Sequence, residues 1–396
     1  MSNIKEISQN LFWVGANDKR LALFENIYPL PNGVSYNSYV LMDEKTALLD
    51  TVDASVADVF FDNLQTVLQG RPLDYVVVQH MEPDHSATLR CLIKKYPEIT
   101  VVCNAKTQNM IHQFFGADLA FKTLLVQEGD TLSLGKHTFT FVMAPMVHWP
   151  EVMMTYEQTE KVLFSADAFG TFGTLDGAIF ADEVNFEKDY LAEARRYYAN
   201  IVGKYGMPVQ TVLKKAAGLD IQMICPLHGF VWRKNLGYFM DKYQHWSTYQ
   251  PEETAAIVAY ASIYGNTAKA AEKMASALVE KGMPVKVYDL SKTGTDVVLG
   301  EVFRASHLVL ASATHDGGIF EPMDYLLHAM LAHNVQGRKV LLMENGSWAP
   351  MAGKQMKTLV EAMKEMTIME QIITIKSALT PEQEKTFAEL AADFVK

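Results

Sequence analysis

Four side chains of metal-binding type crowd into the stretch QHMEPDHSATL, residues 79 to 89: His80, Glu82, Asp84 and His85. The stretch follows the apolar run YVVV, which predicts a buried strand. His80, Glu82 and Asp84 alternate, so an extended segment aims these three the same way, while His85 points toward a neighbouring position. Burying this much polarity is costly unless a cation pairs with it. The stretch therefore predicts a metal site, and one loop of this kind has ligands enough for two ions.

Three further candidate ligands stand at the ends of apolar strands. They are His148 in FVMAPMVHWPE, Asp167 in VLFSADAFG and His228 in MICPLHGF. Imidazole and carboxylate are common ligands of transition metals. Taken alone, Asp167 also reads as a helix cap and His228 as a turn residue.

A second site is predicted near the C-terminus, in the turn SIYGNT between a strand and a helix. Hydroxyl groups, a glycine and the free N–H groups of a helix N-terminus are what binds a phosphate monoester. The alternative is a plain turn capped by its last threonine. Two glycine-rich loops, ATHDGGIF and NGSWAPMAG, also follow strands, where open α/β sheets bind ligands. The candidate residues are Ser262, Ile263, Tyr264, Gly265, Asn266, Thr267, Thr314, His315, Asp316, Gly317, Gly318, Asn345, Gly346, Ser347 and Trp348.

The elements that carry these residues change character near residue 250. Residues 1–250 hold short, irregularly spaced strands with helices between some of them, which predicts an α+β domain of αββα type. Residues 251–396 alternate continuous apolar strands with amphipathic helices, which predicts a doubly wound parallel sheet. We therefore expect two domains, divided at residue 250.

Composition excludes several classes of protein. The formal net charge is -11 and no cluster of Lys and Arg appears, so we expect no nucleic-acid partner. No apolar run reaches the length of a membrane span, and the first residues do not read as a secretion signal. Three cysteines without paired spacing read as reduced thiols. We expect a cytoplasmic protein that does not enter a membrane.

The C-terminal loops resemble the phosphate and ring-binding loops of flavodoxin, which implies FMN; Trp348 lies against the flavin ring or serves as a packing residue. Residues 1–250 resemble the metallo-β-lactamase fold in the order of their ligands. Hydrolases of that fold have histidine where Glu82 stands here, and the exchange favours iron over a histidine-rich zinc pair. A flavin domain on the same chain agrees with a redox metal. The whole chain resembles the flavodiiron proteins.

That resemblance implies two iron ions, one held by His80, Glu82 and His148, the other by Asp84, His85 and His228, with Asp167 bridging. It places a catalytic tyrosine in RRYYANI, for which we favour Tyr197 over Tyr198, although both also read as helix packing. It implies reduction of O2 to water or of NO to N2O, with rubredoxin or a reduced deazaflavin as electron donor. It also implies a head-to-tail homodimer, or a dimer of such dimers.

Two alternatives of other classes stay open. One is a dinuclear hydrolase fused to a flavodoxin module, which would carry zinc. The other is a non-enzymatic electron carrier in which FMN is the working part and the first domain only a scaffold. The second alternative leaves seven metal-binding side chains without a purpose.

Overall fold

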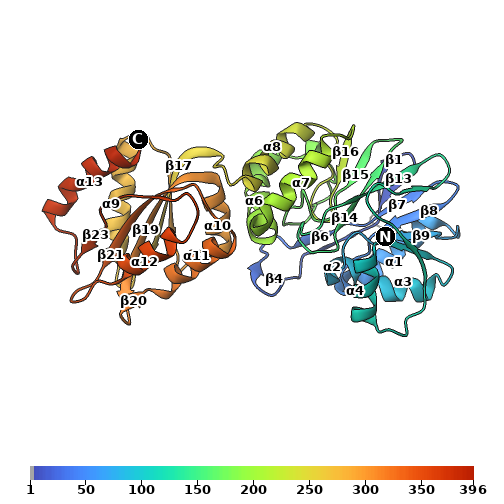
Figure 1. The fold of residues 1–396 in the computed structure, drawn as a ribbon, viewed down its shortest axis with the longest axis horizontal. Helices are drawn as coiled ribbons and strands as arrows, with labels where there is room; N and C mark the ends of the chain where they lie inside the picture. Colours follow the sequence, from blue (N-terminus) through green and yellow to red (C-terminus); the bar gives the residue numbers. More distant parts are fainter. Residues whose placement is uncertain (1–3) are drawn as a thin grey trace. The chain divides into compact units, whose positions relative to one another are not determined.

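The computed structural model describes residues 4–396, which form two compact units (Figure 1). The first unit comprises Met1–Ala194 and Met207–Tyr243, and the second comprises Arg195–Gly206 and Gln244–Lys396. Among residues 4–396, no helix combines the length and the apolar composition needed to cross a membrane.

Two sheets form the centre of the first unit. The seven-stranded sheet has the order β1 (Lys5–Ser8), β2 (Leu11–Trp13), β7 (Tyr39–Met42), β8 (Thr46–Leu49), β9 (Tyr75–Val77), β10 (Thr100–Cys103), β11 (Lys122–Leu125). The five-stranded sheet has the order β12 (Thr131–Ser133), β13 (Thr138–Met143), β14 (Met153–Glu157), β15 (Val162–Phe164), β16 (Met223–Cys225). Two small ribbons complete the strands, β3 (Ala16–Asp18) with β6 (Val34–Tyr36) and β4 (Leu23–Phe24) with β5 (Tyr28–Pro29).

Helices lie on the outer sides of this pair of sheets (Figure 1). They are α1 (Ala57–Leu68), α2 (Pro83–Ser86), α3 (Leu89–Lys95), α4 (Ala105–Phe115), α5 (Phe186–Asp189), α6 (Leu191–Tyr197), α7 (Gly206–Ala216) and α8 (Leu236–Ser247). All residues of β8 and β15 are buried, as expected of strands covered on both faces. The αββα prediction for this region is confirmed.

Parallel pairing determines where the polar loops of the first unit meet. Strands β8, β9 and β10 pair in parallel, and so do β15 and β16. The segments that follow β8 and β9 therefore leave the first sheet at one edge. Those that follow β15 and β16 leave the second sheet together. This arrangement gathers side chains that are distant in the sequence.

The second unit contains a parallel sheet with the order β18 (Val285–Asp289), β17 (Glu253–Ala261), β19 (Ala305–His315), β21 (Lys339–Asn345), to which β22 (Thr367–Ile368) and β23 (Ile373–Ile375) add beside β21. The short β20 (Gly318–Ile319) pairs back on β19. In chain order the sheet reads 2-1-3-4-5, the flavodoxin-like arrangement. Its helices are α9 (Asn266–Glu280), α10 (Thr295–Arg304), α11 (Glu321–Ala332), α12 (Ala352–Glu361) and α13 (Pro381–Phe394).

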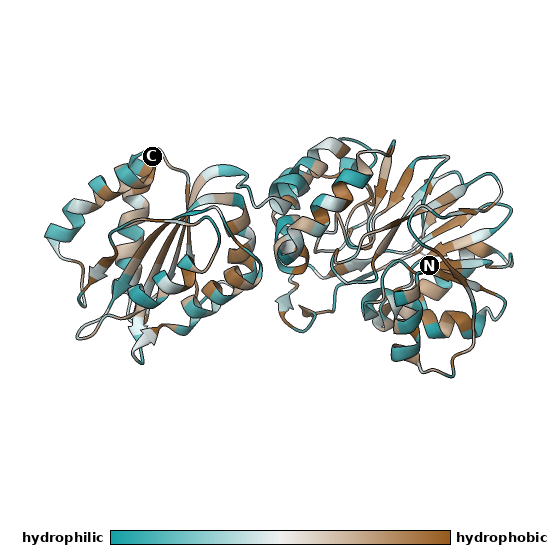
Figure 2. Ribbon diagram, viewed as in Figure 1, coloured by the Kyte–Doolittle hydropathy of each residue, from teal (hydrophilic) through white to brown (hydrophobic). Residues whose placement is uncertain are grey.

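The strands of this second sheet are markedly apolar (Figure 2). Fully buried residues from β17, β19 and β21, such as Val258, Val309 and Leu341, pack with α9 and α13 into one core. Because both faces are covered, the strands read as continuous apolar runs in the sequence. The prediction of a doubly wound sheet is confirmed.

Two stretches group differently from the predicted division at residue 250: residues 244–250 and Arg195–Gly206 both fall in the second unit. Arg195–Gly206 belongs with the second unit, although it precedes residues 207–243 of the first. Its arginines hold it to α10: Arg196 Nη1 lies 2.6 Å from Asp296 Oδ2, and Arg195 Nη1 lies 3.2 Å from Glu301 Oε1. These ion pairs are buried, and they join residues about a hundred positions apart. The pattern of strands and helices in the sequence does not reveal such pairs.

Candidate metal centre and flavin pocket

The structure brings all seven predicted metal ligands together in the first unit. They form two groups, His80 with Glu82, His148 and Asp167, and Asp84 with His85 and His228. Every member is buried. Within each group the potential ligand atoms lie within 4.8 Å of one another.

Strand ends and one short helix position these side chains. His80 follows β9, and Glu82 caps α2, whose first residues include Asp84 and His85. The remaining three come after strands of the second sheet, with His148 between β13 and β14, Asp167 after β15 and His228 after β16. A hydrogen bond from another segment holds the backbone of this short helix: Thr51 Oγ1 donates to the His85 carbonyl at 2.7 Å.

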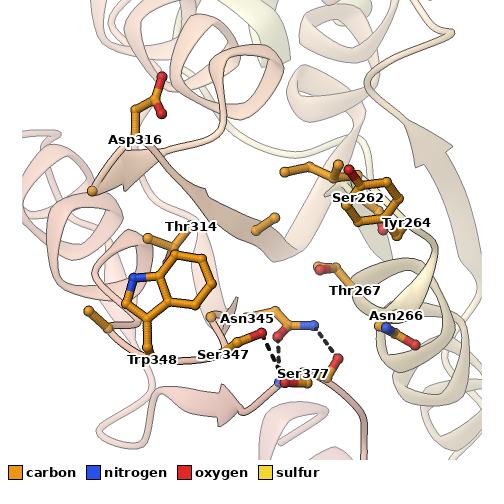
Figure 3. A pocket seen from close by; sticks show the side chains of 15 residues that line it. Ser262, Tyr264, Asn266, Thr267, Thr314, Asp316, Asn345, Ser347, Trp348 and Ser377 are labelled. Carbon is orange, nitrogen blue, oxygen red and sulfur yellow. Dashed lines mark hydrogen bonds between the residues drawn. The ribbon is translucent and has the colours of Figure 1, made fainter.

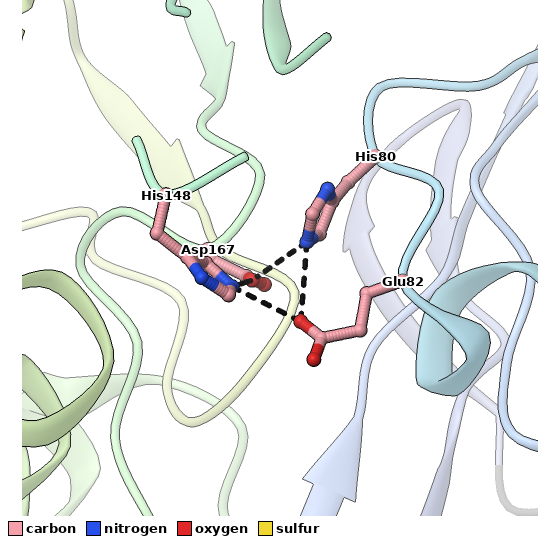
Figure 4. A group of neighbouring side chains, drawn as sticks. All are labelled: His80, Glu82, His148 and Asp167. Atoms are coloured by element: carbon pink, nitrogen blue, oxygen red, sulfur yellow. Dashed lines mark hydrogen bonds and ion pairs between the residues drawn. The ribbon is translucent and has the colours of Figure 1, made fainter. Parts of the chain in front are cut away.

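Distances in the first group fit one metal ion (Figure 4). Glu82 Oε2 lies 3.2 Å from His80 Nε2 and 3.0 Å from His148 Nε2. Asp167 Oδ2 lies 3.3 Å from His80 Nε2 and 3.2 Å from His148 Nε2. Ligand atoms about 2.1 Å from a shared ion are roughly 3.0–3.4 Å apart at tetrahedral or octahedral angles.

The second group has the same spacing. His85 Nε2 and His228 Nε2 face each other at 3.0 Å, and each lies near Asp84 Oδ2, at 3.3 and 3.2 Å. Both oxygens of Asp84 are buried and have no hydrogen-bond partner among residues 4–396. Buried carboxylate oxygens without a donor need another positive partner. The residues present therefore fit a second metal ion.

Asp167 belongs to both groups. While its Oδ2 faces the first group, its Oδ1 lies 3.1 Å from His85 Nε2 and 3.8 Å from His228 Nε2. One carboxylate thus offers an oxygen to each group, which is the arrangement of a bridging ligand.

Electrostatics point to the same need for positive charge. Burial alone would lower the pKa of His148 and of His85, yet Asp167, Glu82 and Asp84 raise these pKa values to about 9 and about 8. Burial would raise the pKa of Asp167, but His85 and His80 hold it well below its usual range. Protons on the imidazoles thus balance the carboxylates when no cation does.

Two buried carboxylates that support the cluster were missed by sequence reasoning. Glu151 Oε1 accepts from His80 Nδ1 at 2.8 Å and from the Met81 N–H at 2.9 Å. Asp50 accepts from the backbone N–H and side-chain amide of Gln79, at 2.7 and 2.8 Å. The available signals were an acidic residue three positions after His148 and another directly after the strand TALL.

A third carboxyl group, Glu25, lies on the loop after β4 beside Glu82. Burial of the carboxyl and the charge of Glu82 raise its pKa to about 8. Phe24, the preceding residue, meets the His228 ring edge-on with centroids 5.4 Å apart. The end of β4 and the loop after it thus contribute one apolar and one acidic side chain to the surroundings of the cluster.

Tyr197 is fully buried, at the junction of α6 and a π-helical turn, Tyr198–Val202. It lies in Arg195–Gly206, which groups with the second unit, whereas the seven candidate ligands belong to the first. Its catalytic role stays a prediction.

The second unit contains a cavity of about 350 Å³ at the carboxyl ends of its strands (Figure 3). Twelve of the fifteen predicted flavin-binding residues line it; Gly265, His315 and Gly318 do not. The lining also includes Ala313, Ala349 and Ser377, which were not predicted. Ser377 follows β23, so the rule that ligands bind at the carboxyl ends of strands would have found it.

Hydrogen bonds join three of the loops around this cavity. Asn345 Oδ1 accepts from the Ser377 N–H and Asn345 Nδ2 donates to the Ser377 carbonyl, both at 3.1 Å. Thr314 Oγ1 accepts from the Met351 N–H at 3.0 Å. These three loops are thus held in place by one another.

The chemistry of the cavity fits FMN. Asn266 and Thr267 form the first turn of α9, where free N–H groups favour a phosphate, and no Lys or Arg lines the cavity. Gly265 has φ +90°, a conformation that glycine adopts without strain. Tyr264 and Trp348 line the same cavity with 93% and 92% of their surface exposed. Exposed aromatic rings beside a cavity suit a flat apolar ligand.

Comparison with known proteins agrees with both sites. The family model described as "ODP family beta lactamase" matches residues 34–229, and the one described as "Flavodoxin" matches residues 258–387. A nitric oxide reductase of Moorella thermoacetica is 30% identical over 377 residues, covering 93% of this chain and 92% of the relative.

Solved structures extend the similarity to the whole fold. Rubredoxin oxygen:oxidoreductase from Desulfovibrio gigas superimposes with a TM-score of 0.93 at 26% identity, covering 99% of this chain and 98% of the other. A flavodiiron protein from Giardia intestinalis superimposes with a TM-score of 0.91 at 24% identity, covering 99% and 96%. Both sites are thus found on a fold that these proteins share.

Proposed function

This chain belongs to the flavodiiron proteins, and from that premise we propose that it reduces O2 to water, or NO to N2O and water, at a pair of iron ions. The observation that carries the proposal is the division of seven buried ligands into two groups that share Asp167. A flavodoxin-type pocket on the same chain supplies the redox partner such a pair needs.

Iron ions held there would bind the gas and supply electrons, and bound FMN would pass on electrons from an outside donor. The residues of the chain hold and tune these groups. His80, Glu82 and His148 would hold one ion, Asp84, His85 and His228 the other, and Asp167 would join them. Carboxylate and imidazole ligands in this proportion suit iron, and three negative charges offset most of the charge of two divalent ions.

Apolar side chains beside the ligands restrict water. Trp149 meets the His80 ring edge-on with centroids 5.3 Å apart, and Phe24 does the same at His228, at 5.4 Å. A dry cluster strengthens each electrostatic contact within it. We propose Tyr197 as the residue that hydrogen-bonds the gas or gives it a proton, in keeping with the tyrosine that the resemblance implies.

Donor, assembly and compartment complete the proposal. A rubredoxin is the donor we favour, as the printed name of the Desulfovibrio gigas protein suggests, with a reduced deazaflavin as the alternative. We propose a head-to-tail homodimer, which sedimentation at about the mass of two chains would support. We place the protein in the cytoplasm, in keeping with its three unpaired cysteines.

The test is consumption of NO, and separately of O2, by the chain loaded with iron and FMN and supplied with reduced rubredoxin. Loss of NO with formation of N2O, or loss of O2 without peroxide, is the expected result. His80→Asn should abolish it, whereas an electron carrier would be unaffected. Absence of consumption with both cofactors bound would contradict the proposal, and zinc with hydrolytic turnover would favour a hydrolase.

A further inference from the structure

The two metal-binding groups are chemically matched in their direct ligands. Each offers two imidazoles and one carboxylate, and Asp167 turns one oxygen toward each. Differences between two ions bound there must therefore arise from the hydrogen-bond partners of the ligands. These partners set the basicity of a histidine ligand.

In the first group a carboxylate outside the ligand set is hydrogen-bonded to one of the ligands. His80 Nδ1 lies 2.8 Å from Glu151 Oε1, and neither side chain is exposed to solvent. Figure 4 shows the other nitrogen of His80 directed toward Glu82 and Asp167. A buried hydrogen bond to an ionised acceptor is strong. It pulls the Nδ1 proton toward Glu151, so Nε2 becomes a better electron donor to a metal.

The second group has weaker acceptors. His228 Nδ1 bonds the Ser35 carbonyl at 2.8 Å, which is a neutral acceptor. His85 Nδ1 is buried and has no hydrogen-bond partner among residues 4–396. These imidazoles therefore donate less charge to a metal than His80 does.

Two other carboxyl groups lie near the first group but do not bind a ligand ring. Asp50 accepts from backbone N–H groups of Gln79 and His80. Glu25 is hydrogen-bonded to the Glu82 carboxyl and not to an imidazole. Glu151 differs from both in being hydrogen-bonded to an imidazole itself.

Building on the diiron function proposed above, we propose that Glu151 makes the iron held by His80, Glu82 and His148 the harder of the two to reduce. A single electron given to the diferric pair by an outside reductant then converts the iron held by Asp84, His85 and His228 to the ferrous state. No bond breaks in this step. Glu151 is a positioning residue that acts through His80.

The test is an anaerobic titration of the full chain, loaded with two irons and FMN, with dithionite as reductant. Electron paramagnetic resonance follows the form that carries one electron per iron pair and gives both one-electron potentials. The first potential describes the addition of one electron to the diferric pair, and the second describes the addition of another electron to the one-electron form. In Glu151→Gln the second potential should rise more than the first. We expect the equilibrium constant for forming the one-electron form to fall about tenfold, which corresponds to about 59 mV in the separation of the potentials.

Glu157→Gln is the matched control. Glu157 is equally buried, and it accepts from the backbone N–H groups of Thr159 and Glu160 at 2.8 and 2.6 Å. Its replacement should leave both potentials unchanged. Glu151→Asp retains a carboxylate at greater distance and should give a smaller change in the same direction, so it replaces Glu151→Gln if that variant loses iron.

A separation of potentials that changes no more in the Glu151 variants than in Glu157→Gln would overturn the proposal. So would a rise of the first potential alone, since the electron would then enter the His80 iron first. Failure of the proposed function is a separate result: the potentials can shift as expected in a chain that consumes neither gas. A chain that binds no iron overturns both.

Discussion

The metal centre and the flavin pocket are built in opposite ways. The metal centre consists of seven buried side chains, collected from positions 80 to 228, and neither oxygen of Asp84 has a hydrogen-bond partner among residues 4–396. The pocket consists of loops at one edge of a sheet, with backbone N–H groups, hydroxyls and two exposed rings. Single side chains should therefore matter greatly in the first site and modestly in the second.

The largest effect should come from Asp167→Asn, because Asp167 faces both metal groups. Loss of its charge removes a ligand from each ion, so we expect fewer than two irons per chain. Gas consumption should fall at least about 100-fold, beyond what loss of an outer partner does. FMN content should be unchanged. Iron and flavin analysis with an NO or O2 electrode measures all three.

Asp182→Asn is the control for that variant. Asp182 pairs with Arg233 and Lys234 elsewhere in the first unit. It should keep both irons and full activity. Two irons in Asp167→Asn would show that the carboxylate does not bridge, and loss of FMN would show that the two sites are not independent.

The second effect is a dependence of stability on pH that only the iron-free chain should show. The pKa values of His148 and His85 are raised to about 9 and about 8, above the value near 6.5 expected in the unfolded chain. Raised imidazole pKa values stabilise the fold below about pH 6.5, and this stability is lost as the pH rises to about 9. At about 1.4 kcal/mol per pKa unit, the loss is on the order of a few kcal/mol.

Native-state hydrogen exchange at amides of β8, β9 and β15 would measure this loss in the first unit alone. The iron-loaded chain is the control, because metal ions take the place of the protons and the slope should be small. Amides of β17 and β19, in the second unit, should show no such trend. A flat response of the iron-free chain would contradict the raised pKa values.

The same contrast explains what could be predicted from the sequence. His80, Glu82, Asp84 and His85 were recognisable because four ligands stand in six positions, and the flavin loops because each follows an apolar strand. Glu151 was missed, since its role rests on hydrogen bonds to His80 and Met81, which are 71 and 70 positions away. The assignment of Arg195–Gly206 to the second unit was not predicted for the same reason, because it depends on buried ion pairs to α10.

In the flavin pocket, Thr267→Val should weaken FMN binding about tenfold. Thr267 is 3% exposed in the first turn of α9 and lines the cavity, and we expect its hydroxyl to bond the phosphate at this helix N-terminus. One hydrogen bond to a charged group contributes about 1.5–3 kcal/mol, but neighbouring N–H groups remain, so we expect the lower end. Fluorescence titration of the flavin-free chain measures the dissociation constant.

Thr358→Val is the matched control on α12, where the hydroxyl donates to the Lys354 carbonyl of its own helix. It should bind FMN normally. Iron content should be the same in both variants. Equal FMN affinity of Thr267→Val and the unaltered chain would place the phosphate elsewhere.

The smallest effect should come from Trp348→Leu, which tests whether an exposed ring lies against the flavin. Contact between aromatic rings adds about 0.5–1.5 kcal/mol, so FMN binding should weaken about threefold to tenfold, and Trp348→Phe should keep most of the affinity. Tyr325→Leu is the control, because that ring is 60% exposed on α11 and does not line the cavity. Trp348→Leu and Tyr325→Leu with equal affinity would mean that Trp348 only shields the mouth of the pocket. The contrast between the two sites would then be greater, because the flavin would be held without the Trp348 ring, whereas the metals would still depend on single ligand side chains.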